Sequence, residues 1–97
     1  DGPSAGIAIV TSILSLILSK KVSKEISMTG EISLRGDILK IGGLKEKIIG
    51  AYNNGIKTIY IPEHNKADLE EIPKIIKNDI NIITVTNYKE IFDAIFA

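Results

Sequence analysis

Two short segments of this sequence carry residues that could perform nucleophilic chemistry together. Ser4 lies in Gly2-Pro3-Ser4-Ala5, and Lys47 follows the glycine pair Gly42-Gly43. Both segments are predicted to begin a helix. A serine there lies beside unpaired backbone N–H groups and the positive end of the helix dipole, where an oxyanion is stabilised. A lysine held nearby could remove the serine proton, so Ser4 is a candidate nucleophile and Lys47 a candidate base.

A lysine acts as a base only when its amine is neutral. Its pKa must then fall from about 10.4 towards about 7 to 8, a change that costs about 3 to 5 kcal/mol and requires a packed, partly dry site. Leu44, Ile48 and Ala51 form an apolar helical face that such a site could use. Lys47 flanks one border of this face and Lys45 flanks the other, so helical geometry does not choose between the two lysines.

Two further residues could take part in such a site. Thr29 lies on the polar side of a predicted strand, where it could hydrogen-bond the lysine amine or orient the serine hydroxyl. By itself, a surface threonine in a strand is the more ordinary interpretation. His64 is the single histidine, so a Ser-His-Asp triad would have to use it. Without cysteine, and with one histidine, we expect no bound metal or cofactor in this chain.

The composition describes one ordinary globular domain. The chain has 97 residues, 44% of them hydrophobic and 25% charged, with a formal net charge of zero. Lysine and arginine are not in excess, and three tyrosines and two phenylalanines offer little for base stacking. We therefore expect no nucleic-acid binding.

An uncharged, mostly apolar run over residues 5–19 raises the question of a membrane span. A span needs about 20 apolar residues, and this run is shorter and is interrupted by Thr11, Ser12 and Ser15. We therefore expect no membrane partner. The run is instead predicted to form a core helix that starts after Pro3 and is covered on most sides.

The next segment is predicted to form a β-hairpin. Apolar and polar residues alternate over residues 26–35, which is typical of a half-buried strand. Gly36-Asp37 is a plausible turn, and residues 38–41 return as the second strand. Residues 44–52 then read as a helix.

Strands and helices alternate in the second half of the chain. The expected elements are a strand over residues 57–61, a helix from Lys66, a strand over residues 80–85 and a helix after Asn87. Asn65 is predicted to cap the first of these helices, and Pro73 to interrupt it. Asn87 and Glu90 form a capping box for the last. The pattern predicts parallel strands covered by helices, an α/β fold to which the hairpin adds α+β character.

Three segments resemble, in order and spacing, the proteolytic domain of the Lon family of ATP-dependent proteases. They are Asp1-Gly2-Pro3-Ser4-Ala5-Gly6, Met28-Thr29-Gly30-Glu31 with Leu34-Arg35-Gly36, and Gly42-Gly43-Leu44-Lys45-Glu46-Lys47. Further similarity runs through Gly55-Ile56-Lys57-Thr58, Ile61-Pro62 and Asp68-Leu69-Glu70-Glu71-Ile72-Pro73. The resemblance implies the Lon proteolytic fold, with residues 1–97 as its C-terminal portion. We expect the upstream part of that domain and the ATPase module to lie outside this chain.

The resemblance also assigns roles to individual residues. It implies that Ser4 is the nucleophile and Lys47 the general base, with Lys45 as a supporting or surface residue. Thr29 corresponds to a threonine beside the dyad lysine. The backbone around Ser4 and Ala5 would contribute to the oxyanion site. His64 has no part in this scheme.

The implied function is that of a serine endopeptidase with a Ser-Lys dyad, which hydrolyses unfolded or damaged proteins in protein quality control. An ATPase module with ATP and Mg would deliver these substrates, and the full-length family assembles as a hexamer. No phosphate-binding Gly-x-x-x-x-Gly-Lys motif is present here. The expected compartment is the bacterial cytoplasm, with the mitochondrial matrix as the alternative.

Two other functions are compatible with the residues. A Lon-like domain could serve assembly or binding without proteolysis. A phosphate-containing ligand could bind at the helix start around Gly2-Pro3-Ser4, because helix N-termini bind anions.

Overall fold

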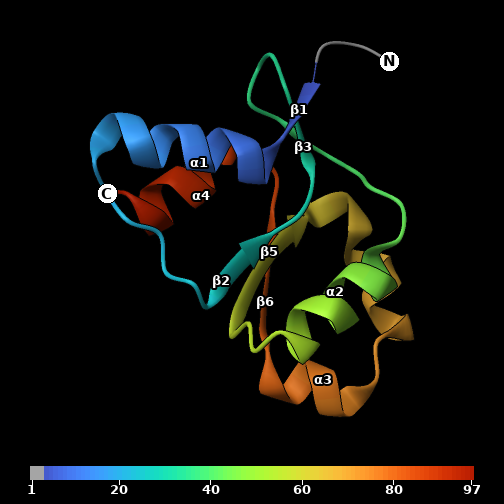
Figure 1. The fold of residues 1–97 in the computed structure, drawn as a ribbon. Coiled ribbons are helices and arrows are strands. Elements are labelled where there is room, and N and C mark those ends of the chain that lie inside the picture. The colour runs from blue at the N-terminus through green and yellow to red at the C-terminus, as the bar shows by residue number, and fades with distance from the viewer. Residues whose placement is uncertain (1–3) are drawn as a thin grey trace.

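A computed structural model describes the backbone of residues 4–97 and the side chains of residues 6–97. Figure 1 shows two small sheets flanked by helices. The antiparallel sheet has the order β1-β3-β4 and contains β1 (Ser4–Gly6), β3 (Glu31–Ser33) and β4 (Ile38–Leu39). The parallel sheet has the order β2-β5-β6 and contains β2 (Ile26–Met28), β5 (Thr58–Pro62) and β6 (Asn81–Val85).

Helices cover both faces of the parallel sheet. They are α1 (Ile7–Leu18), α2 (Leu44–Asn53), the 3-10 helix η1 (Glu63–Glu71), α3 (Lys74–Asp79) and α4 (Tyr88–Ile95). In Figure 1, α1 and α4 lie together on one side, and α2 and α3 lie on the other. Mixed helices and strands confirm the predicted α/β class, and β5 to α4 confirm the strand-helix-strand-helix pattern.

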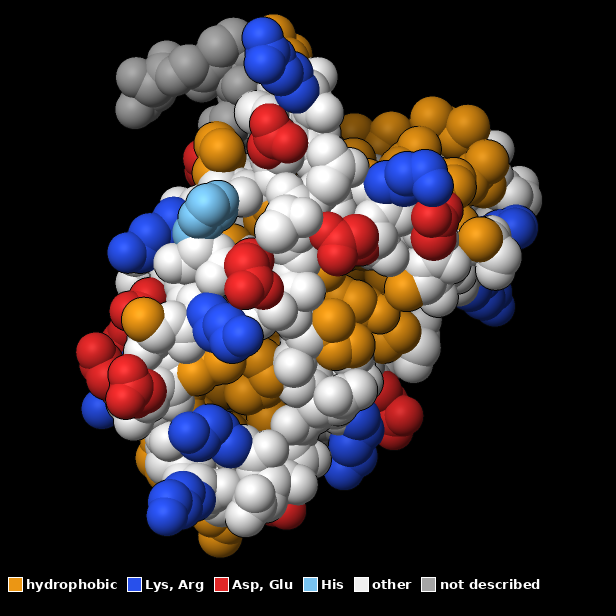
Figure 2. Space-filling model, turned by 180° about the vertical axis from the view of Figure 1, so that it is seen from behind, with side chains coloured by type: hydrophobic (Ala, Val, Ile, Leu, Met, Phe, Trp, Pro, Cys, Tyr) orange, Lys and Arg blue, Asp and Glu red, His pale blue; other side chains and the backbone are white. Residues whose placement is uncertain are grey.

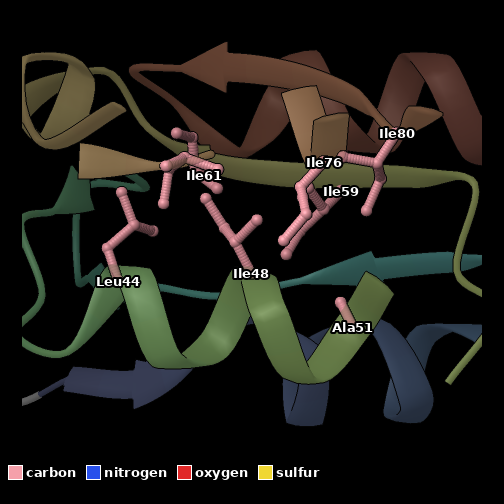
Figure 3. Close-up of a cluster of buried hydrophobic side chains, with 8 residues drawn as sticks. Leu44, Ile48, Ala51, Ile59, Ile61, Ile76 and Ile80 are labelled. Carbon is pink, nitrogen blue, oxygen red and sulfur yellow. The ribbon is translucent and has the colours of Figure 1, made fainter. Parts of the chain in front are cut away.

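The central strand β5 separates two hydrophobic cores. Successive side chains of a strand point to opposite faces, and β5 is buried on both. Ile59 and Ile61 face the α2 side, whereas Tyr60 faces the α1 and α4 side. Figure 3 shows the first core, made of Leu44, Ile48, Ala51, Ile59, Ile61, Ile72, Ile76 and Ile80. The apolar face predicted for α2 is therefore the face that packs on β5.

The predicted single strand over residues 26–35 is two strands in different sheets. β2 runs parallel to β5, and β3 pairs antiparallel with β1 and β4, so the hairpin is confirmed and the continuous strand is wrong. The break falls at Gly30, whose φ of 140° is readily adopted by glycine alone. The alternation of apolar and polar residues in the sequence continues from Ile26 and Met28 to Ile32 and Leu34, so it does not reveal the break.

The first helix begins later than the sequence predicted. β1 occupies Ser4–Gly6 and α1 starts at Ile7, with Gly6 extended at its N-cap. The cause is backbone pairing, because Ser4 lies opposite Ser33 and Gly6 opposite Glu31. Pro3, the expected start signal, lies outside the described residues.

The prediction that this helix is covered on most sides is wrong for the described structure. Ile7 and Thr11 are the buried residues of α1, whereas Leu16 is 81% exposed. Ile9, Ile13 and Ile17 are exposed too. Figure 2 shows hydrophobic side chains gathered over the end of the molecule that holds α1 and α4. An apolar composition makes burial favourable, but tertiary neighbours decide whether it occurs.

Polar contacts fix the buried side of α1. The Thr11 hydroxyl donates to the carbonyl of Ile7 (2.8 Å) and lies 2.6 Å from the Tyr88 hydroxyl. Burial raises the pKa of Tyr88, an effect that the hydrogen bond with Thr11 partly offsets. Beyond the C-terminus of α1, Lys20 Nζ donates to the carbonyl of Phe96 (2.5 Å). These bonds fasten α1 to the segment containing α4.

The capping box predicted for the last helix is confirmed. The Asn87 side chain accepts from Lys89 N–H, and the Glu90 carboxylate accepts from the backbone N–H groups of Thr86 (2.8 Å) and Asn87 (3.0 Å). These backbone hydrogen bonds, first that of Thr86, lower the pKa of Glu90.

No helix in the described part of the chain has the length and apolar character required to cross a membrane.

We expect burial on α1 to govern the effect of truncating its apolar side chains. Ile7→Ala removes a fully buried side chain and should lower the free energy of unfolding by about 2 to 5 kcal/mol. Leu16→Ala should cost less than about 0.5 kcal/mol because that side chain is already in water. Urea unfolding followed by circular dichroism measures both. Equal losses in the two variants would contradict the exposed position of Leu16.

The α4 capping box should make stability depend on pH. Because the pKa of Glu90 is lowered by folding, its contribution is present above the unfolded pKa of about 4.3 and is lost as pH falls through the folded value. Glu90→Gln should therefore destabilise the fold at pH 7 and much less at pH 3. Glu70→Gln, at an exposed position of η1, is the matched control. A Glu90→Gln effect that is the same at both pH values would refute this role of the carboxylate.

Candidate active site

Two of the residues singled out in the sequence, Thr29 and Lys47, line the same pocket. It has a volume of about 340 Å³ and lies where β2 faces α2 and the start of β5. Its lining residues are Ser27, Met28, Thr29, Lys47, Ala51, Asn54, Ile56 and Ile59. The fold thus brings together a threonine and a lysine that are well separated along the chain.

The packing of α2 sets the position of Lys47. α2 begins at Leu44, directly after Gly43, whose φ of 70° favours glycine. Lys47 N–H closes the first turn on the Gly43 carbonyl (3.2 Å). Leu44 and Ile48 are buried on β5, and Lys47 projects exposed beside that face.

The two lysines that sequence geometry left equivalent lie in different surroundings. Lys47 lines the pocket with Thr29, whereas Lys45 lines a separate hollow near the start of α2, with Asp68 and Glu71. Of these two lysines, Lys47 is therefore the one that lines the described pocket of the candidate supporting threonine.

The segment before α2 is held by a residue whose role the sequence did not reveal. Asn65 is fully buried inside η1; its side chain accepts from Ile41 N–H (2.9 Å) and donates to the Ile41 carbonyl (2.8 Å) and to Asp68 (2.8 Å). The prediction that Asn65 caps a helix from Lys66 is wrong, because η1 begins at Glu63 after Pro62. Asparagine before a polar run is typical of a cap, and no local signal indicates a bond to distant backbone.

Thr29 lies at the corner where the chain changes sheets. Its N–H donates to the Tyr60 carbonyl (3.0 Å), which continues the pairing of β2 with β5. The carbonyl of the next residue, Gly30, accepts from Ile7 N–H (3.0 Å). The junction of β1 and α1 is therefore bound directly to the corner that carries Thr29.

Ser4 can be followed only as backbone. It lies in β1 opposite Ser33, two residues before the junction with α1. The side chains of Ser4 and Ala5, and all of Asp1, Gly2 and Pro3, lie outside what is described. The Ser4–Lys47 contact and the oxyanion site around Ser4 and Ala5 stay predictions.

His64 does not line the pocket with Lys47. It is exposed in η1. Within the described residues, no group of three or more His, Cys, Asp or Glu side chains is arranged to hold a metal ion.

The whole chain, residues 1–97, matches the family model of the Lon protease (S16) C-terminal proteolytic domain. This chain belongs to the Lon protease family. The resemblance seen in the nucleophile, hairpin and lysine segments is thereby confirmed, and the family is one of proteases.

Similar Lon proteases come from bacteria and from a mitochondrion. The Lon protease of Mycoplasma pneumoniae is 54% identical over 96 residues, which cover 99% of this chain and 12% of that protein. That of Orientia tsutsugamushi is 55% identical over 97 residues, covering 100% of this chain and 12% of the relative. The mitochondrial Lon protease homolog of Yarrowia lipolytica is 48% identical over 96 residues, which cover 99% of this chain and 8% of that protein. The Lon chain described here thus spans about an eighth or less of the relatives it matches.

We expect Gly30, next to the candidate site, to tolerate no side chain. A Cβ there would lie 3.2 Å from Ile38 Cγ2 and 3.3 Å from Pro62 Cγ, at a φ that alanine disfavours. Gly30→Ala should cost about 1 to 3 kcal/mol and displace Thr29. Gly50→Ala is the matched control: it lies in α2 with open space around its Cβ position and should stabilise by about 0.5 to 1 kcal/mol. Thermal unfolding of both variants measures the effect, and a Gly30→Ala protein as stable as the parent would contradict this constraint.

Proposed function

We propose that this chain is the catalytic portion of a serine endopeptidase that uses a Ser4-Lys47 dyad. Membership of the Lon family supports proteolysis as the reaction class. The observation that carries the assignment of residues is the shared pocket of Lys47 and Thr29, from which Lys45 is absent.

In the proposed reaction, the neutral amine of Lys47 takes the proton of the Ser4 hydroxyl as Ser4 attacks the peptide carbonyl. Protonated Lys47 then donates to the leaving amine, and an acyl-enzyme forms. Water, deprotonated by the same lysine, releases the acyl group. Thr29 holds the Lys47 amine, and backbone around Ser4 and Ala5 stabilises the oxyanion.

This mechanism sets a condition on the surroundings of Lys47. The proposed base must be neutral when it acts, and removal of water from around an amine favours the neutral form. Lys47 is exposed among the described residues. We infer that bound substrate or other polypeptide covers this pocket during catalysis and removes water from the amine.

The remaining parts of the proposal concern the whole protein. In it, an ATPase module that binds ATP and Mg delivers unfolded or damaged polypeptides, six copies assemble, and the reaction serves protein quality control. The bacterial and mitochondrial origins of the similar proteins support a bacterial cytoplasm, with the mitochondrial matrix as the alternative.

The two alternatives differ in how well the structure supports them. A Lon-like assembly domain would need neither Ser4 nor Lys47, so variants at these positions separate it from a protease. The phosphate-ligand alternative relied on a helix starting at Ser4. Because α1 starts at Ile7, that alternative loses the feature that suggested it.

The dyad can be tested in a chimera of the Mycoplasma pneumoniae Lon protease, in which this chain replaces the 96 residues that match it. Cleavage of an unfolded protein by the chimera is then measured. Ser4→Ala and Lys47→Ala should each lower kcat by about a thousandfold or more. Thr29→Val should lower it about 10- to 100-fold, as expected for a lost hydrogen bond to the base. Lys45→Ala is the matched control and should retain activity. Cleavage that persists in both dyad variants would refute the proposal.

A further inference from the structure

We propose that Met28 is a site of reversible oxidation, where hydrogen peroxide converts the thioether to a sulfoxide and thereby loosens the attachment of α1 to β2. Met28 is the single methionine of the chain, which has no cysteine and no tryptophan. Its sulfur is therefore the group of this chain that a peroxide oxidises most readily. This modification is independent of the proposed dyad, because it uses neither Ser4 nor Lys47.

Met28 lines a hollow between α1 and β2, named here the α1–β2 hollow. The volume of the hollow is about 510 Å³. Its lining residues are Ala8, Thr11, Ser12, Ser15, Leu16, Val22, Ile26, Ser27 and Met28. Met28 is half-buried, and hydrogen peroxide is little larger than water, which occupies about 30 Å³. A peroxide can therefore reach this side chain in the folded protein.

The Thr11 hydroxyl occupies one side of the sulfur. Thr11 Oγ1 donates to Met28 Sδ (3.0 Å), and it also lies 2.8 Å from the Ile7 carbonyl and 2.6 Å from the Tyr88 hydroxyl. A hydroxyl has one proton, so Ile7 and Met28 share the proton of Thr11, and Tyr88 then donates to Thr11. The second lone pair of the sulfur is left to react from the side of the hollow.

The oxidation transfers one oxygen atom and two electrons. The free lone pair of Met28 Sδ attacks one oxygen of hydrogen peroxide, an S–O bond forms and the O–O bond breaks. The transferred oxygen gives its proton to the departing hydroxide, which leaves as water. The sulfur loses two electrons and the peroxide gains them, so no further reactant is needed.

The sulfoxide changes the contact that Met28 makes with α1. Its sulfur carries partial positive charge and no longer accepts from Thr11, so the hydrogen bond between α1 and β2 is lost. The new oxygen is polar and takes up space in the α1–β2 hollow. Met28 also packs on the core that contains Ile7 and Tyr88, which this change disturbs.

The change also reaches the candidate active site. Thr29 follows Met28 directly, and Met28 is among the residues that line the pocket of Thr29 and Lys47. Oxidation of this one sulfur therefore alters two neighbouring sites, the α1–β2 hollow and the pocket.

The accessibility of the sulfur is tested by treating the folded chain with hydrogen peroxide and following the gain of one oxygen atom by mass spectrometry. The folded chain should react within about tenfold of the rate of the urea-unfolded chain, because the hollow admits the peroxide. Met28→Leu keeps the side-chain volume and is the matched control, which should gain no oxygen at this rate. A folded chain that reacts more slowly than this would overturn the site.

The position of Thr11 predicts which of the two sulfoxide epimers forms. Each of the two classes of methionine sulfoxide reductase reduces one epimer, so digesting the oxidised chain and treating the peptides with each enzyme measures both. The folded chain should give one epimer in at least about fourfold excess, and the unfolded chain about equal amounts. Thr11→Ala should remove the excess, whereas Ser12→Ala, on the same hollow, should retain it. Equal amounts from the folded parent would refute attack from the hollow.

The structural effect is measured by thermal unfolding of the oxidised chain. Its Tm should fall by about 4 to 8 °C, and reduction by the two enzymes should restore it. Peroxide treatment of Met28→Leu should leave Tm unchanged. In NMR spectra, oxidation should shift the amide signals of Thr11 and Tyr88 but not that of Ile75 in α3. An unchanged Tm after complete oxidation would overturn the proposed loosening of α1.

Discussion

The change of direction at Gly30 is the constraint on which both sheets depend. One stretch of backbone supplies an edge strand of the parallel sheet and, a few residues later, the central strand of the antiparallel sheet. A left-handed φ with Ile38 and Pro62 packed around it allows this turn without a long loop. The Gly30 carbonyl also accepts a hydrogen bond from Ile7 N–H, and this bond positions the start of α1 at the same corner.

The candidate site follows from this corner and from the rigid helix opposite it. The hydrogen bond from Thr29 N–H to the Tyr60 carbonyl fixes Thr29 at the end of β2. The packing of Leu44 and Ile48 on β5 positions α2 so that Lys47 lines the same pocket. Buried Asn65 holds the backbone that enters α2. The supporting residues of this candidate site lie on well-packed elements, whereas the Lys47 side chain is exposed.

Sequence signals were reliable where the cause is local. The capping box of Asn87 and Glu90, the glycine pair before α2 and the hairpin turn all act within a few residues and were predicted. The break at Gly30, the exposure of α1 and the role of Asn65 depend on distant partners, so alternation, composition and cap preference pointed elsewhere. For the site, family resemblance selected Lys47 and Thr29. Their pocket also contains Ala51 and Ile59, which are brought together by the packing of α2 on β5, a tertiary contact that the sequence alone does not indicate.

The spacing of the paired strands along the chain also has a kinetic consequence. β3 and β4 are neighbours in sequence, so their hairpin can close on the microsecond scale typical of such units. β2 must instead find β5, with Ile26 opposite Thr58, and β1 must find β3, with Ser4 opposite Ser33. Closing these long loops costs chain entropy before any contact compensates for it. The segments bearing Ser4 and Thr29 are therefore expected to join the folded structure late, after the hairpin that will hold them has formed.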